Sequence, residues 1–381
     1  MPAPLPPVAN EADSDARIVE SAVDALRAQL PPGWSVNLEL QPARLTEGWR
    51  PDAAITVDAP GGGRPARLVA AYEPEITPKK AVEVARRLQS YLDENPEAQG
   101  LVVAPWGSRR TREVLRQLGI GFIDPTGNID LVLKDPGLVV RVDGADQNPV
   151  PNRPVSPSLR GPKAWALMKT MIEVIPPYGV RELAAAVGTD PGYTSRVLRA
   201  LEEERLITRE RRGPVTEVDW PALLTQLTSS YSLLDANETS TWIARGAVWD
   251  LPATLAASRF ETRWAVTGSL GATLIAPVAA PAMAVIYADD PVELAGTLGL
   301  LPAETGANVI FARPYSNAAY ARSWKTDDAT YVSVAQLAAD CLTGIGRMPA
   351  EGEALVEWMR ANEDRWRAPD FDTSPNPLSQ R

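Results

Sequence analysis

Residues 160 to 218 carry the pattern that most restricts how this chain folds: three apolar stripes at helical spacing, followed by two short β-prone runs. In the first stripe, apolar residues recur every three or four positions from Ala164 to Ile175, and Pro176-Pro177 would end that helix. The second stripe runs from Val180 to Val187. It stops at Gly188, a residue that can adopt the left-handed conformation of a helix C-terminus. The spacing therefore predicts two successive amphipathic helices.

A third helix is predicted to begin after the N-cap Asp190, with Pro191 in its first turn. Its inward side consists of Thr194, Val197, Leu198 and Leu201. Its outward side is polar and consists of Tyr193, Ser195, Arg196 and Arg199. The segment from Ile207 to Val218 then has two β-prone runs around a Gly213-Pro214 tip, which predicts a hairpin.

Three helices followed by a hairpin form the sequence pattern of a winged helix-turn-helix DNA-binding domain. In such domains the exposed start of the last helix enters the major groove, where arginine can bind guanine through two hydrogen bonds. Residues 160 to 212 contain ten Lys and Arg against seven Asp and Glu, a net charge of +3 in a chain whose total is −10. Local positive charge favours contact with DNA phosphates. The candidate DNA-binding residues are Lys163, Tyr193, Ser195, Arg196, Arg199, Arg209, Arg211 and Arg212.

The same domain could instead serve only for protein contacts, because three acidic residues, Glu202 to Glu204, close the third helix. The remaining composition limits the chemistry available. The chain has no histidine and one cysteine, Cys341, which we expect to be core. Histidine-dependent triads, histidine zinc sites and a disulfide within the chain are therefore excluded. Catalysis would have to use carboxylates, Lys or Tyr with a divalent metal, and we expect neither a bound metal nor a cofactor.

Periodicity and length predict an α/β multidomain protein, since 381 residues suffice for two to four domains. The expected order is a disordered start (1–13), an endonuclease-like α/β domain (14–147), a proline-rich linker (148–158), the winged helix (159–219), a connecting helix (220–239), a nucleotidyltransferase-like α/β domain (240–367) and a tail (368–381). No signal peptide or run of eighteen apolar residues is recognised. We therefore expect a cytoplasmic protein that does not bind a membrane.

In the N-terminal part of the chain, Thr77 and Ser108 are predicted to cap helices, and the apolar run from Leu101 to Ala104 is typical of a buried, parallel strand.

The predicted element order of the N-terminal domain, α-β-β-β-α-β-α-β, resembles the restriction-endonuclease-like fold. In that fold, carboxylates on neighbouring strands hold Mg²⁺ and a lysine positions the attacking water. Asp52, in a Pro-Asp pair, matches the first carboxylate, and Glu73 lies where the second belongs. Glu75 stands in place of the lysine, so we expect an inactive domain retained for packing, dimerisation or DNA contact. Activity would require Lys79 or Lys80 to reach in from the following helix.

The C-terminal domain resembles a minimal nucleotidyltransferase core, with a strand, Gly268-Ser269, a helix, and Asp289-Asp290 at the end of the next strand. In that core Gly-Ser binds the triphosphate and paired carboxylates hold two Mg²⁺ ions. Adjacent strand residues point to opposite faces, however, and no Lys or Arg occurs from Gly268 to Glu304. We expect Gly268 to permit close helix–strand packing and the two aspartates to end a strand.

Three segments together resemble a known family: residues 103–128, with Asp124-Pro125-Thr126-Gly127-Asn128; residues 267–272, with Thr267-Gly268-Ser269; and residues 338–358. The chain resembles actinobacterial AbiEi-type antitoxins and related transcriptional regulators of type IV toxin-antitoxin systems. The resemblance implies a repressor that binds promoter DNA through the winged helix and has a functional link to a nucleotidyltransferase toxin. Prototype members begin with the winged helix, whereas here another domain precedes it. A homodimer bound to double-stranded DNA is the expected assembly, and a DNA-targeted metal-dependent nuclease or nucleotidyltransferase is the alternative function.

Overall fold

The computed structural model describes residues 11–40, 49–149, 159–211, 213–258, 260–327 and 329–379. The chain forms two compact units, each treated separately below. Unit 1 comprises Met1–Val155 with Glu203–Arg205, and unit 2 comprises Ser156–Glu202 with Leu206–Arg381. The expected disordered start and linker lie largely outside the described residues, but a helix already begins at Glu11, inside the segment expected to be disordered. Within the described ranges, no helix is long and apolar enough to cross a membrane.

Unit 1 contains a seven-stranded mixed sheet whose strands lie side by side in chain order. The strands are β1 (Ser35–Leu40), β2 (Ala53–Asp58), β3 (Ala66–Tyr72), β4 (Ala98–Val103), β5 (Gly121–Ile123), β6 (Ile129–Leu133) and β7 (Leu138–Val142). β3, β4 and β5 are parallel to one another, and the other neighbours are antiparallel. β4 is the buried apolar run that the sequence predicts as a parallel strand, and this prediction is confirmed.

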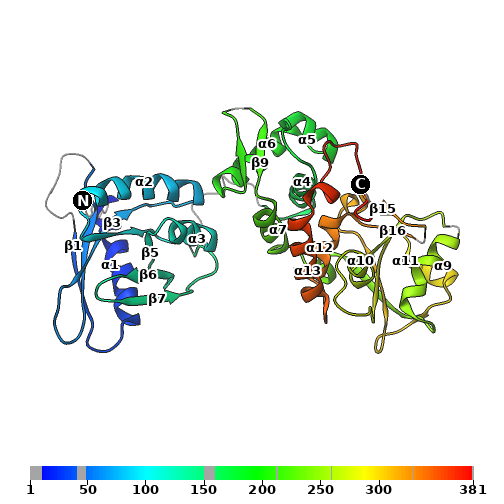
Figure 1. Cartoon of the computed structure of the whole chain (residues 1–381), viewed down its shortest axis with the longest axis horizontal. Coiled ribbons are helices and arrows are strands. Elements are labelled where there is room, and N and C mark those ends of the chain that lie inside the picture. The colour runs from blue at the N-terminus through cyan, green and yellow to red at the C-terminus, as the bar shows by residue number, and fades with distance from the viewer. Residues whose placement is uncertain are drawn as a thin grey trace, which may run out of the picture. The chain divides into compact units, whose positions relative to one another are not determined.

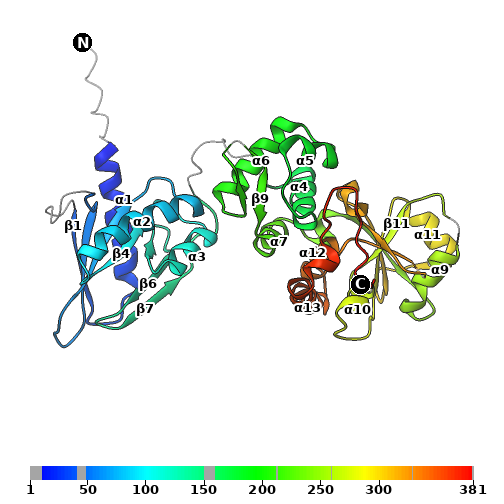
Figure 2. The same cartoon turned by 45° about the horizontal axis from the view of Figure 1, so that its top comes forward.

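Helices cover both faces of this sheet, as Figures 1 and 2 show. α1 (Glu11–Gln29) packs on one face, and α2 (Pro78–Glu94) and α3 (Arg109–Gln117) pack side by side on the other. Because strand side chains alternate between faces, the sheet separates two apolar cores, one under α1 and one under α2 and α3.

Capping residues set where α2 and α3 begin. The Thr77 hydroxyl accepts a hydrogen bond from the Lys80 amide at 3.2 Å, and the Ser108 hydroxyl accepts one from the Thr111 amide at 3.1 Å. Each bond satisfies a backbone donor that has no partner within the first helical turn. Both caps are predicted from the sequence, and both are confirmed.

Unit 2 begins with three helices and a hairpin, which we call the helix–hairpin module (Pro162–Val218). Its elements are α4 (Pro162–Glu173), α5 (Val180–Val187), α6 (Pro191–Glu203), β8 (Ile207–Arg209) and β9 (Val215–Val218). β8 and β9 pair antiparallel, and Tyr178 adds an antiparallel bridge to Val215. All five elements occur in the segments where the sequence predicts them, although α4 ends earlier than predicted. α5 ends at Gly188 with a φ of 71°, the left-handed geometry expected there.

α4 differs from its prediction because it has no solvent-exposed face beyond its first turn. Every residue from Ala164 to Glu173 is buried, including the charged Lys169. α7 (Trp220–Thr228) and α12 (Val334–Leu342) also pack against α4, so its polar side meets protein instead of water. The helix ends at Glu173, before the predicted Ile175, which is 40 % exposed.

A second seven-stranded mixed sheet forms the rest of unit 2, in the order β13-β10-β14-β12-β11-β16-β15. Its strands are β10 (Glu238–Ile243), β11 (Trp264–Thr267), β12 (Ala284–Ala288), β13 (Leu301–Pro302), β14 (Val309–Arg313), β15 (Trp324–Lys325) and β16 (Thr330–Tyr331). The single connecting helix predicted at 220–239 is wrong: α7 ends at Thr228, the short α8 (Leu233–Ala236) follows, and β10 begins at Glu238.

The helices around this sheet are α9 (Leu251–Ala257), α10 (Ser269–Ile275), α11 (Pro291–Thr297), α12, α13 (Met348–Ala361) and α14 (Glu363–Trp366), with 3-10 turns at Val248–Asp250 and Asn317–Tyr320. In Figures 1 and 2, α9 and α11 lie beside each other, away from the packed group α10, α12 and α13. One continuous apolar core extends from Trp165 to Ala368 and includes Cys341, which is core as predicted. The helix–hairpin module therefore shares its core with the C-terminal sheet.

Candidate functional sites

α6 presents a polar and basic face to solvent. Ser195, Arg196 and Arg199 are exposed, whereas the side of the helix predicted to face inward is buried. Tyr193 is half-buried, and its ring centroid lies 6.0 Å from the guanidinium carbon of Arg196. Burial raises the pKa of Tyr193, so its hydroxyl remains a neutral hydrogen-bond donor. The Asp190 carboxylate accepts the Tyr193 amide at 3.0 Å and so caps the helix as predicted.

The predicted basic residues outside α6 have different surroundings. Arg211 is exposed at the hairpin tip, and Lys163 is exposed in the first turn of α4. Arg209 is half-buried, and its Nη2 donates to the Gly213 carbonyl at 3.2 Å. Arg209 therefore holds the hairpin tip together in addition to carrying charge. Arg212 lies outside the described residues.

The two carboxylates predicted for a nuclease-like site lie at the same edge of the unit 1 sheet. Asp52 precedes β2, and its Oδ2 accepts a hydrogen bond from the Tyr72 amide at 2.9 Å, while Glu73 directly follows β3. Burial raises the pKa of Asp52 and the charge of Glu73 raises it further, whereas the Tyr72 amide and Arg87 lower it.

Two cations from α2 pair with Glu73, whose side chain is 7 % exposed. Lys80 Nζ lies 3.3 Å from Oε2, and Arg87 Nη2 lies 2.5 Å from Oε1. Of the two lysines that the sequence offers for this role, Lys79 and Lys80, it is Lys80 that approaches this carboxylate. Glu75 is exposed. Because both Glu73 oxygens are in ion pairs, a metal ion would have to displace one of them. Over the described ranges, no cluster of three or more acidic or cysteine side chains has the arrangement of a metal site.

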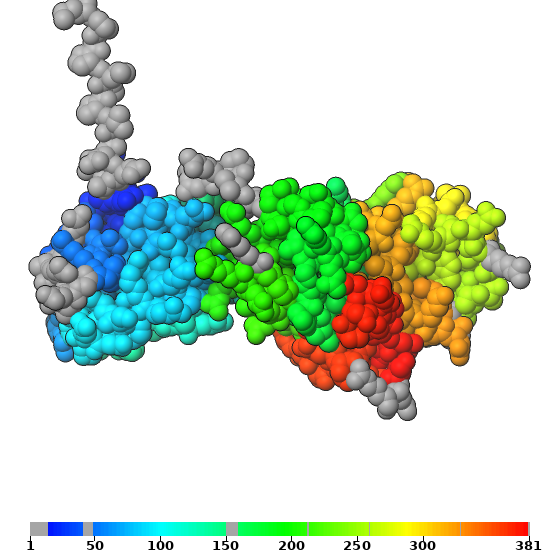
Figure 3. Space-filling view, turned by 90° about the horizontal axis from the view of Figure 1, so that it is seen from above, coloured from blue at the N-terminus to red at the C-terminus, as the bar shows by residue number. Residues whose placement is uncertain are grey.

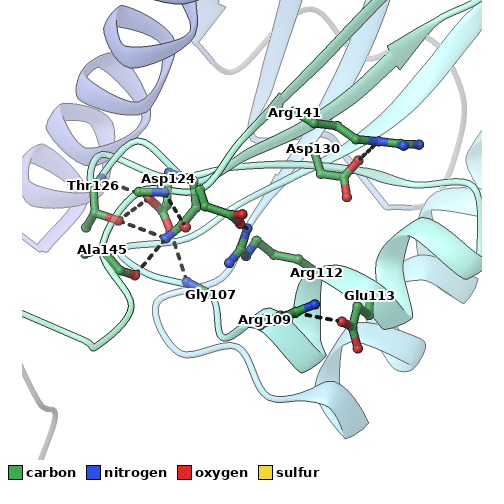
Figure 4. Close-up of polar contacts among 12 residues, drawn as sticks. Gly107, Arg109, Arg112, Glu113, Asp124, Thr126, Asp130, Arg141 and Ala145 are labelled. Atoms are coloured by element: carbon green, nitrogen blue, oxygen red, sulfur yellow. Dashed lines mark hydrogen bonds and ion pairs between the residues drawn. The ribbon is translucent and has the colours of Figure 1, made fainter. Parts of the chain in front are cut away.

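A buried carboxylate joins the loop between β5 and β6 to the segment before α3 (Figure 4). Asp124 is fully buried and accepts the amides of Gly107, Thr126 and Asn128 at 3.1, 2.9 and 3.1 Å. The Thr126 hydroxyl and the Asn128 side-chain amide donate to it as well, at 2.6 and 2.9 Å. These bonds, together with one from Asn128 to the Ala145 carbonyl, explain the polar residues of the Asp-Pro-Thr-Gly-Asn motif as a stabilised turn.

The Gly268-Ser269 pair begins α10 in close contact with α13. Gly268 has a φ of 65°, and a Cβ there would lie 2.6 Å from Met348 Cε of α13 and 3.3 Å from Val285 Cγ2 of β12. The contact with β12 confirms the predicted close packing of helix and strand. The Ser269 hydroxyl donates to the buried Glu351 carboxylate at 2.6 Å. The serine is thus engaged by α13.

The adjacent aspartates after β12 have separate structural partners. Asp289 accepts hydrogen bonds from Arg263 Nε at 2.8 Å and from the Tyr320 hydroxyl at 3.1 Å. Asp290 caps α11 by accepting the amides of its first turn at 3.0 and 3.1 Å. Both follow the end of β12, as predicted, and the two carboxylates do not converge on one site.

A buried polar cluster centred on Asp340 is not predicted from the sequence. Asp340 is fully buried on α12 and accepts hydrogen bonds from Thr267, Tyr231, Gln336 and Tyr287 at 2.6, 2.7, 2.8 and 3.0 Å. Burial raises the pKa of Asp340 to about 6, and these donors oppose the rise. The available signal is the pair Gln336 and Asp340, polar residues four positions apart in an otherwise apolar helix.

A second buried cluster connects α4 to the C-terminal part of the chain. Lys169 Nζ lies 2.7 Å from Glu173 Oε1, and Arg322 Nη1 lies 3.3 Å from Glu173 Oε2. The Ser333 hydroxyl, at the start of α12, also donates to Glu173, and Lys169 donates to the Ala321 carbonyl at 3.2 Å. Burial lowers the pKa of Lys169, whereas the neighbouring Glu173 raises it. The four-residue spacing of Lys169 and Glu173 could have indicated their ion pair from the sequence, but no local signal indicates the contacts with Arg322 and Ser333.

Comparison with known proteins identifies no family. No protein-family model matches the chain, and no curated protein matches it. Among solved structures, the chain is similar to "Structure of EndoMS in apo form", with 18 % sequence identity and a TM-score of 0.20. The match covers 29 % of this chain and 45 % of that chain, so this chain spans less than half of its length.

Proposed function

We propose that the helix–hairpin module is a winged helix-turn-helix and that the protein is a DNA-binding transcriptional repressor. The observation that carries this proposal is the exposed face of α6, with Ser195, Arg196 and Arg199, directly before a hairpin whose tip exposes Arg211. α6 would enter the major groove, where arginine binds guanine, and the hairpin would contact phosphates.

The same proposal includes the roles expected of the other parts. Unit 1 would be an endonuclease-like domain without activity, and the C-terminal sheet a nucleotidyltransferase-like domain that acts as the antitoxin part of a type IV toxin-antitoxin system. Supporting an inactive C-terminal domain, Ser269 is held by Glu351 and Asp290 caps a helix. The protein would bind DNA as a homodimer, because paired recognition helices contact half-sites about one helical turn apart.

The proposal is tested by fluorescence anisotropy with duplexes selected from a random-sequence library by the purified protein. Arg196→Ala or Arg199→Ala should weaken specific binding by about 1 to 3 kcal/mol, since each removes a base contact. Arg211→Ala should weaken binding to all duplexes alike. Arg360→Ala, which removes an exposed charge from α13, is the matched control and should leave affinity unchanged. Absence of binding to any duplex, or wild-type affinity in both α6 variants, would contradict the proposal.

A metal-dependent nuclease targeted to DNA is the second candidate. The observation that favours it is the approach of Lys80 to Glu73, because α2 thereby supplies a cation that Glu75 does not. The same contacts weigh against it, since Lys80 and Arg87 together engage both oxygens of the carboxylate that a metal would need. We therefore rank the repressor first.

A further inference from the structure

The segment Arg367–Phe371, which we call the C-terminal strap, is an integral part of the helix–hairpin module although it begins about 150 residues after it. The sequence predicts most of it as a tail, and the structure contradicts this. Ala368 is fully buried and pairs in parallel with Val174; its amide donates to the Glu173 carbonyl at 2.7 Å, and its carbonyl accepts the Ile175 amide at 2.9 Å. In Figure 3 the red C-terminal residues lie against the green residues of the module.

Arg367 fixes the strap to the end of α4. Its side chain is 8 % exposed, and its Nε and Nη2 donate to the carbonyls of Ile172 and Val174 at 3.1 and 3.2 Å. The last carbonyls of a helix lack partners within it and carry partial negative charge. The Arg367 guanidinium donates hydrogen bonds to these carbonyls and places a positive charge beside them. The strap therefore caps the first helix of the module.

Phe371 continues the contact to the hairpin. Its ring packs edge-on against Tyr178 with centroids 5.3 Å apart, and its carbonyl accepts Arg322 Nη2 at 3.3 Å. Tyr178 in turn exchanges two backbone hydrogen bonds with Val215 of β9, at 3.0 and 3.3 Å. A continuous set of contacts therefore leads from the strap through Tyr178 to the hairpin.

We propose that the C-terminal strap positions the hairpin for contact with DNA phosphates, with Phe371 acting through Tyr178. This inference rests on the proposed DNA-binding function. A hairpin of three and four residues is too short to be stable alone, so its direction depends on what it packs against. In this protein the hairpin is held by Tyr178 through its backbone hydrogen bonds to Val215, and the ring of Phe371 packs against Tyr178. Changing the strap should therefore alter the hairpin contribution to binding and leave the base contacts of α6 in place.

The test compares Phe371→Ala with Leu378→Ala in the full-length protein. Leu378 is an exposed apolar residue in the same terminal segment and serves as the matched control. With Phe371→Ala, affinity should fall for specific and non-specific duplexes alike. The slope of log K against log salt should also become shallower by about 0.9 for each phosphate that the hairpin no longer neutralises. Combined with Arg211→Ala, the decrease in affinity should be less than additive, because both changes act on the same interaction with phosphate.

A second readout needs no DNA. Hydrogen exchange of the β8 and β9 amides should be faster in Phe371→Ala and unchanged in Leu378→Ala, because the hairpin loses its support. Unchanged salt slope and unchanged exchange in Phe371→Ala would overturn the inference even if the wild-type protein binds DNA. If the wild-type protein binds no duplex but Phe371→Ala still exchanges its β8 and β9 amides faster, the repressor proposal fails. The support of the hairpin by Phe371 through Tyr178 would then stand without it.

Discussion

Replacing Glu173 by glutamine should destabilise unit 2 strongly, and by more than Asp340→Asn or Glu353→Gln. Lys169 and Glu173 have side chains that are each 2 % exposed, and Arg322 is 9 % exposed. Water therefore screens their interactions only weakly. Glutamine keeps the shape and one acceptor oxygen, so the change isolates the effect of removing the negative charge.

The magnitude follows from the distances. At an effective dielectric constant of about 20, unit charges separated by 2.7 and 3.3 Å attract by roughly 6 and 5 kcal/mol. Relaxation of the structure and partial entry of water offset much of this lost Coulomb energy. Breaking a buried ion pair by removing one partner therefore typically costs about 3 to 5 kcal/mol. We expect Glu173→Gln to lie in that range. Lys169→Met in the same background should recover part of the stability, because it removes one of the two uncompensated cations.

The free energy of unfolding of unit 2 is measured by urea unfolding monitored by hydrogen-exchange mass spectrometry. This method reports on peptides of unit 2 separately from those of unit 1. Glu353→Gln, at an exposed position on α13, is the control and should stay within about 0.5 kcal/mol of wild type. A Glu173→Gln variant whose unit 2 is within about 1 kcal/mol of wild type would refute the reasoning. So would a further decrease in stability on adding Lys169→Met.

Three further outcomes are expected. The pKa of Asp340 is raised by burial to about 6, so the folded state binds this proton more tightly. Protonation of Asp340 therefore stabilises the folded state fully below about pH 4, and this stabilisation, about 3 kcal/mol in total, is lost as the pH rises through about 6. In urea titrations, Asp340→Asn should abolish this pH dependence of the free energy of unfolding, and an unchanged pH profile in that variant would contradict the prediction. Purified protein with Mg²⁺ or Mn²⁺ should not cut DNA, because Glu73 is already paired; cleavage that disappears in Asp52→Ala would promote the nuclease. Calorimetry at millimolar Mg²⁺ should detect no binding of ATP, GTP, CTP or UTP, whereas tight binding abolished by Asp289→Ala would identify an enzyme.

Local signals in the sequence were sufficient for much of the secondary structure. The caps Thr77 and Ser108, the left-handed Gly188 and the apolar run of β4 each depend on interactions within a few residues, and all occur as predicted. The exposed face of α6 also follows from periodicity alone, because Arg196 and Arg199 lie opposite an apolar stripe. These are the residues on which the proposed function depends.

Tertiary contacts decided what periodicity could not. The short strands β13, β15 and β16 have two residues each and exist only because a neighbouring strand pairs with them. Likewise, Lys80 meets Glu73 because of how α2 packs on the sheet, and the spacing of Lys79 and Lys80 in the sequence could not decide this.

The contrast between local signals and contacts with distant residues also explains which features of α4 and the C-terminal strap the sequence predicted. The sequence determined that α4 is a helix, since its apolar spacing and the prolines after it act locally. It did not show that Lys169 and Glu173 are buried, because their partners Arg322 and Ser333 come from about 150 residues away. Ala368 reads as part of a polar tail for the same reason, as its burial depends on the end of α4. Only the folded chain brings these segments together, and their pairing links the proposed DNA-binding module to the C-terminal sheet.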